Sequence, residues 1–142
     1  MKKLLFLLAL CVAIVLSSCG LDKKTEYYSE RSNYITAIGT ISHIKYNEEN
    51  DVLYLGIEQL SPEFADIAFK IVGKNLLIVQ ENGIDQKLQI GKQIEFISAP
   101  RYFGDGYVMP IVGVTIDGEV LLDFEQGYYN WLEWIESMEH GA

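Results

Sequence analysis

The sequence predicts a mainly β fold of the α+β type: a small barrel of five to six short strands, with a short internal helix and an amphipathic C-terminal helix. Residues 34–46 (YITAIGTISHIKY) are rich in β-branched side chains and tyrosine, which favour strands. Residues 93–98 (QIEFIS) alternate between polar and apolar side chains, as half-buried strands do. Asp117 and Gly118 separate two apolar runs and form a typical hairpin turn. About six short strands with one interior and one terminal helix indicate a small barrel.

The first predicted strand, at 34–46, contains an interruption at Gly39. Its isoleucines recur every three residues, which by itself would indicate a helix. The β-branched content and the interior glycine favour a strand whose buried face switches at a β-bulge. We therefore expect one long, bent strand here.

Further strands are expected at 52–57, 67–72, 93–98, 111–116 and 119–122, with a hairpin loop at 47–51 and a turn or short helix beginning at Ser61 and Pro62. The segment Asn75 to Gly83 has two interpretations. It is either a helix capped by Asn75 and stopped at Gly83, or a buried strand that enters a turn. We favour the helix.

The last predicted element is a helix that Asp123 caps, with Gln126 three residues later. An apolar stripe recurs at helical spacing along it, formed by Trp131, Trp134, Ile135 and Met138. The acidic residues Glu133, Glu136 and Glu139 lie largely away from this stripe. Such a stripe usually packs on its own domain, so the tryptophans are expected in the core first and in partner binding second.

The order of these elements over residues 34–122 resembles an OB-fold. In that fold the first strand commonly bends at a glycine, and a helix lies between the third and fourth strands. The resemblance concerns topology and pattern, and a plain α+β roll is the main alternative.

The N-terminal segment has the pattern of a signal peptide. Lys2 and Lys3 precede an apolar run at 4–16, and Ser17 and Ser18 end that run. A bilayer span needs about 20 apolar residues, so a run of this length is short for a membrane helix. Residues 1–18 are therefore predicted to be a cleaved signal peptide.

The four residues from Leu16 to Cys19 resemble the lipobox of bacterial lipoproteins, an aliphatic residue and two small residues before a cysteine. The resemblance implies that Cys19 is lipidated and becomes the first residue of the mature protein. The protein would then be held on the extracytoplasmic side of the cell membrane or outer membrane. Residues 19–33 would form the lipidated cysteine and a flexible tether, and residues 34–142 a single domain. The alternative is an ordinary secretory signal that leaves Cys19 as a free thiol.

The charge of the mature chain is strongly negative. Without Lys2 and Lys3, nine basic residues face 20 acidic ones, a net charge near −11, and no Lys or Arg follows Arg101. Nucleic acids and anionic headgroups are poor partners for such a surface. With Cys19 lipidated and Cys11 removed, no thiol remains for a disulfide or a metal site.

No motif indicates catalysis, a cofactor or a metal. His43 lies in a predicted strand and His140 in the C-terminal tail, and no serine stands at a recognisable spacing from a base. Gly104 and Gly106 give only G-x-G, too little for a phosphate loop. The oxygen-rich run at 47–51 matches no calcium-loop spacing, so a solvated hairpin is expected. We therefore predict a protein that is not an enzyme and binds no cofactor and no metal.

One segment indicates a partner-binding loop. Arg101, Tyr102, Phe103 and Tyr107 surround a Gly104–Gly106 turn. Arginine and aromatic side chains at exposed tips are typical anchors of interfaces. In the alternative, these aromatic side chains pack over the end of the barrel.

Three functions follow from the sequence. The preferred one is a lipid-anchored, non-catalytic binding or scaffold module with a protein or peptide partner. The second is an immunity-type or sequestering lipoprotein whose acidic C-terminal third binds a cationic peptide. The third is an envelope hydrolase.

Overall fold

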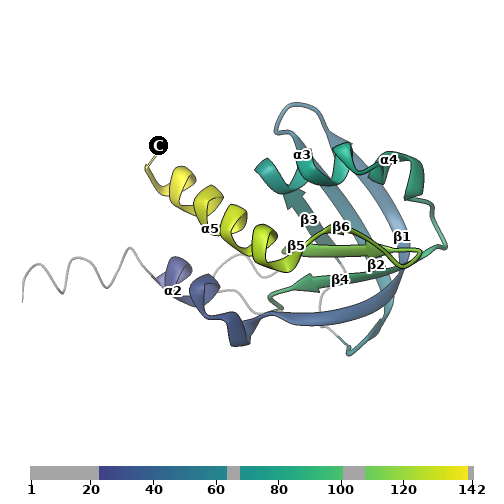
Figure 1. The fold of residues 1–142 in the computed structure, drawn as a ribbon, viewed down its shortest axis with the longest axis horizontal. Coiled ribbons are helices and arrows are strands. Elements are labelled where there is room, and N and C mark those ends of the chain that lie inside the picture. The colour runs from purple at the N-terminus through teal and green to yellow at the C-terminus, as the bar shows by residue number, and fades with distance from the viewer. Residues whose placement is uncertain (1–22, 64–67, 101–107, 141–142) are drawn as a thin grey trace, which may run out of the picture.

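Six strands form one sheet that closes into a ring in the computed structural model, which describes residues 23–63, 68–100 and 108–140 (Figure 1). The strands are β1 (Ile35–Asn47), β2 (Val52–Ser61), β3 (Ala68–Val72), β4 (Gln93–Ser98), β5 (Met109–Ile116) and β6 (Glu119–Leu122). The helices are α2 (Lys23–Ser29), the short 3-10 helix η1 (Arg31–Asn33), α3 (Gly73–Glu81), α4 (Ile84–Lys87) and α5 (Phe124–His140).

The strand order is β3-β2-β1-β4-β5-β6, and a parallel pairing of β3 with β5 closes the ring. Every other pairing is antiparallel. The long strand β1 pairs with β4 along its first half and with β2 along most of its length, so it belongs to both sides of the ring. Helix α3 lies between β3 and β4 in the chain. This arrangement is the OB-like barrel that the sequence predicts, and the fold class is confirmed.

The bend in β1 occurs at Gly39, as predicted. The pairing of β1 with β2 shifts register between Ile38 and Thr40. A Cβ atom at Gly39 would lie 2.5 Å from Cγ2 of Ile57 and 2.9 Å from the carbonyl oxygen of Glu58. Only glycine therefore allows β1 and β2 to approach this closely at the bulge.

The ring encloses the main hydrophobic core, at the centre of which the rings of Phe69 and Phe96 meet edge to face with centroids 4.8 Å apart. Helix α3 contributes Leu76 and Val79 to this core, and α4 contributes Ile84. The helical interpretation of residues 75–83 is confirmed, because most of this run belongs to helix α3. Only one face of the helix is buried.

The predicted cap of this helix is wrong. Helix α3 begins at Gly73, so Asn75 lies inside its first turn rather than at its N-cap. The Asn75 side chain is buried. Its Nδ2 donates to the carbonyl oxygen of Gly127 (2.9 Å), and its Oδ1 accepts from Nδ2 of Asn130 (3.0 Å). Asn75 therefore joins α3 to α5 instead of starting α3.

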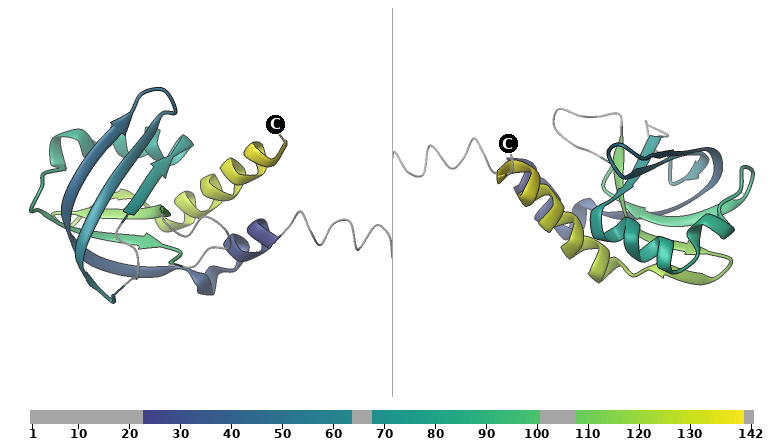
Figure 2. Two further views of the ribbon diagram at one scale, coloured as in Figure 1. Left: turned by 180° about the vertical axis from the view of Figure 1, so that it is seen from behind. Right: turned by 90° about the horizontal axis from the view of Figure 1, so that it is seen from above.

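A second hydrophobic core lies outside the ring, where α2 and α5 pack beside the barrel (Figure 2). Trp131 is at its centre and is 2% exposed. The tryptophan stripe is thus part of the core, as expected, with Trp134 stacked on Trp131 at a centroid distance of 5.2 Å. Met138 does not follow this pattern, since it is 58% exposed, and the buried stripe ends at Ile135. Asp123 does cap α5, accepting from the backbone N–H of Gln126 (3.4 Å).

The prediction of a flexible tether is wrong for residues 23–33, which form α2 and η1. Tyr28 is 2% exposed and meets Trp131 edge to face at 5.1 Å. The physical reason is the large surface of an aromatic side chain. One such side chain buries about 150–250 Å², which can fix a short polar helix to a neighbouring element. Residues 23–33 therefore belong to the fold, ahead of the predicted start at residue 34. Residues 1–22 lie outside the described part of the chain.

Tyr34 makes the second core sensitive to alkali. Its hydroxyl donates to the carbonyl oxygen of Tyr28 (2.7 Å), and burial raises the pKa of Tyr34 above its usual 10.0. A raised pKa means that the stability from this group is complete below pH 10 and is lost as the pH rises further.

We expect Tyr34→Phe to lower the free energy of unfolding by about 1 kcal/mol at neutral pH, the net value of one hydrogen bond. Above pH 10 the variant should lose stability less steeply than the wild type, because its unfolded state has one hydroxyl fewer to ionise. Urea unfolding followed at several pH values measures both effects. Equal alkaline slopes for the two proteins would contradict the assignment.

Candidate ligand-binding hollow

The partner-binding loop predicted from the sequence, with Arg101, Tyr102, Phe103 and Tyr107, lies outside the described residues. The structure describes the positions on either side of it. Before it, Ser98 pairs with Ile35 at the start of β1, and its hydroxyl donates to the carbonyl oxygen of Pro110 (2.7 Å). Ser98 and Pro110 therefore lie close together beside the start of β1. Its role stays a prediction.

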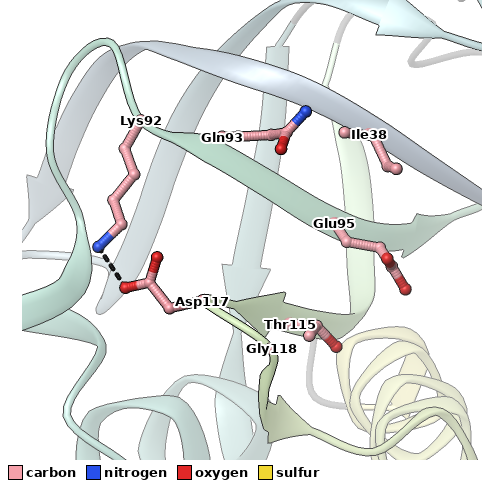
Figure 3. A pocket seen from close by; sticks show the side chains of 7 residues that line it. All are labelled: Ile38, Lys92, Gln93, Glu95, Thr115, Asp117 and Gly118. Atoms are coloured by element: carbon pink, nitrogen blue, oxygen red, sulfur yellow. Dashed lines mark hydrogen bonds and ion pairs between the residues drawn. The ribbon is translucent and has the colours of Figure 1, made fainter.

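A shallow hollow of about 240 Å³ lies on the outside of the barrel, where β1, β4 and β5 run side by side (Figure 3). We call it the outer-face hollow. It is lined by Ile38, Lys92, Gln93, Glu95, Thr115, Asp117 and Gly118.

The strand register brings the floor of the outer-face hollow together. Glu95 of β4 pairs with Thr115 of β5 on one side and with Ile38 of β1 on the other. Glu95 alternates with the buried Ile94 and Phe96 of β4, and Thr115 lies between the buried Val114 and Ile116 of β5. The period of two therefore turns one side chain from each strand to the outside, where the three meet.

An ion pair forms one wall of the outer-face hollow. Nζ of Lys92, just before β4, lies 2.6 Å from Oδ2 of Asp117 in the turn between β5 and β6. Asp117 and Gly118 both have positive φ (55° and 76°), as the tight hairpin turn predicted here requires. The turn therefore aims the Asp117 carboxylate at Lys92 and away from Glu95 (Figure 3).

A second depression of about 180 Å³ adjoins the first and shares Glu95 and Thr115 with it. Its further lining is largely apolar and includes Ile97, Val120 and Phe124. Ile97 lies across Gly113, where an added Cβ would come within 2.9 Å of its Cδ1 atom. The two depressions form a surface that is polar at the β5–β6 turn and apolar toward the start of α5.

The two carboxylates that line the outer-face hollow do not face each other. Hydrolysis by two carboxylates needs both side chains to face one bond. Here Asp117 is held by Lys92, and Glu95 points in another direction (Figure 3). Thr115, Gln93 and Glu95 offer hydrogen-bonding groups beside an apolar strip, a combination suited to an extended peptide.

Four carboxylates of the acidic C-terminal third are paired within the molecule. Four ion pairs each join one of its carboxylates to a cation from earlier in the chain: Arg31–Glu125, Lys74–Glu133, Lys87–Glu119 and Lys92–Asp117. These pairs use acidic residues that would otherwise attract a cationic peptide. These four carboxylates therefore have partners within the fold.

The Arg31 pair also fastens the N-terminal segment to α5. The guanidinium makes two hydrogen bonds to the Glu125 carboxylate and lies 4.4 Å from the centroid of the Tyr128 ring. Arg31 lowers the pKa of Glu125 through the hydrogen bonds and its charge. Because both groups are exposed, this pair positions η1 more than it stabilises the fold.

Sequence reasoning missed the outer-face hollow. The alternation at 93–98 indicates that Glu95 points outward, but no motif links it to Ile38 or Thr115. His43 and the oxygen-rich run at 47–51, neither of which is predicted to be a site, do not line the hollow. His43 is exposed on β1, and residues 48–51 form an exposed turn between β1 and β2.

Comparisons with protein-family models, with curated proteins and with solved structures found no match to this chain. Within the described ranges, no three His, Cys, Asp or Glu side chains are grouped so that they could hold a metal ion. None of the helices in those ranges has the length and apolarity that a membrane span requires.

Proposed function

We propose that this chain is an extracytoplasmic lipoprotein anchored to the membrane through Cys19, and that its barrel is a non-catalytic module that binds a peptide or protein segment. The anchor is supported by the residues from Leu16 to Cys19, which resemble a lipobox. The binding role is supported by the outer-face hollow and its apolar neighbour, which together form one graded surface across β4 and β5.

The anchor suits a binding module that acts near the membrane. One acyl chain gives marginal membrane binding, and two or more hold a protein stably. A lipidated Cys19 would therefore keep the barrel at the envelope without any basic patch. This agrees with the acidic composition of the mature chain.

The partner is expected to be an extended segment. An extended chain exposes side chains alternately and could place apolar groups over Ile97 and Val120 while its polar groups reach Glu95 and Thr115. The orientation of the Asp117 carboxylate toward Lys92 favours this binding role over the hydrolase alternative.

Glu95→Arg should abolish partner capture because it places a long cation at the point that both depressions share. The matched control is Glu81→Arg, the same change at an exposed position at the end of α3. Cross-linking in intact envelopes, followed by purification of the protein, measures capture. A partner that is retained by Glu81→Arg and lost by Glu95→Arg supports the site. Equal capture by both variants would rule out the outer-face hollow.

A further inference from the structure

We propose that the end of the barrel formed by α2 and α5 lies against the headgroup layer of the membrane, and that the β5–β6 turn points away from it. This inference rests on the proposed anchor at Cys19. It adds an orientation that the anchor alone does not specify.

The first step is the reach of the chain between Cys19 and α2. Only Gly20, Leu21 and Asp22 separate Cys19 from Lys23, where α2 begins. Four consecutive Cα steps span at most about 14 Å, whatever conformation those residues adopt. A domain of this size is about 35 Å across. The start of α2 therefore stays within less than half a domain diameter of a lipidated Cys19.

The second step is that α2 does not lengthen this connection, because it is fastened to the rest of the protein. Detaching it would expose Tyr28, at a cost of about 1.5–3 kcal/mol for one large apolar side chain. Three hydrogen bonds would also break, and one of them is the bond from the Tyr34 hydroxyl to the carbonyl oxygen of Tyr28. The Tyr128 hydroxyl donates to the carbonyl oxygen of Ser29 (2.5 Å), and Nδ2 of Asn33 donates to that of Tyr27 (2.8 Å).

The third step is where this connection enters the molecule. The start of α2 and the last turns of α5 lie at one end of the long axis, and the β5–β6 turn and α4 lie toward the opposite end (Figures 1 and 2). Residues 117–118 of that turn line the outer-face hollow. The polar end of the hollow is thus on the side of the barrel that is remote from the anchor.

Energy transfer from a fluorophore on the protein to an acceptor on lipid headgroups tests this orientation. The lipidated full-length protein is reconstituted in phosphatidylcholine vesicles that contain one-fifth phosphatidylglycerol. One variant carries the donor at Met138→Cys, which is exposed in the last turns of α5. The matched variant carries it at Asp85→Cys, exposed on α4. Transfer should be several-fold more efficient from position 138.

A spacer variant shows whether the short connection is the cause. A flexible Gly/Ser insertion between Gly20 and Leu21 should bring the two transfer efficiencies close together. Vesicle flotation keeps this test separate from the test of the anchor. Protein that fails to float overturns both the anchor and the orientation. Protein that floats but shows equal transfer from positions 138 and 85, or more from 85, overturns the orientation alone.

Discussion

Gly127→Ala should lower the free energy of unfolding by about 3 kcal/mol, the upper part of the range for overpacked positions. Gly127 lies in the first turn of α5, where that helix crosses β5. An added Cβ would be 1.9 Å from the carbonyl oxygen of Val112 and 2.7 Å from its carbonyl carbon. Backbone atoms cannot rotate out of the way, so α5 would have to move off the sheet.

The expected loss of stability is opposite in sign to the usual effect of this substitution in a helix. At an unconstrained position inside a helix, replacing glycine by alanine stabilises by about 1 kcal/mol. Urea unfolding followed by tryptophan fluorescence measures the change. The control is Gln126→Ala at the neighbouring exposed position, which should stay within about 0.5 kcal/mol of the wild type. A Gly127→Ala protein that equals or exceeds the wild type in stability would show that α5 does not lie this close to β5.

Trp131→Ala should cost about 3–5 kcal/mol, the usual range for removing a fully buried tryptophan. Trp131 contacts the Tyr28 ring edge to face, stacks on Trp134, and has the Nζ atom of Lys70 5.8 Å from its ring. Without it, α2 loses the side chain that holds it. We therefore expect amide exchange in residues 23–29 to become much faster than in the barrel strands.

Trp134→Ala is the matched control for this prediction, since it removes the same side chain one turn further along α5. Trp134 is only partly buried, so its loss should cost roughly half as much or less. Hydrogen exchange of both variants in a native buffer, together with urea unfolding, separates the two. Equal effects of the two substitutions, or unchanged exchange in α2 when Trp131 is removed, would contradict the second core as described.

Local patterns were sufficient for much of the barrel. Strands β4 and β6 occur at the predicted bounds, because alternation and the Asp117–Gly118 turn are properties of adjacent residues. The bend at Gly39 followed in the same way from a glycine inside a β-branched run. The order of these elements along the chain then indicated the OB-like topology.

The failures concern contacts between residues that are far apart in the chain. Residues 23–33 are too polar to indicate a packed helix, and Tyr28 is buried only because Trp131 lies opposite it. Asn75 resembles a helix cap by type, but its partners are on α5. The outer-face hollow likewise depends on the registers that align Ile38, Glu95 and Thr115, and no single segment contains that information.

The central claim is the anchor at Cys19, and the mass of the mature N-terminal peptide tests it most directly. Protein purified from membranes should begin at Cys19 and carry the added mass of a diacylglyceryl group, with or without a third acyl chain. Cys19→Ser protein should lack this mass and should no longer be released from its signal peptide at that position, while its barrel unfolds at the same urea concentration as the wild type. An unmodified Cys19, or an N-terminus elsewhere in wild-type protein, would contradict the account.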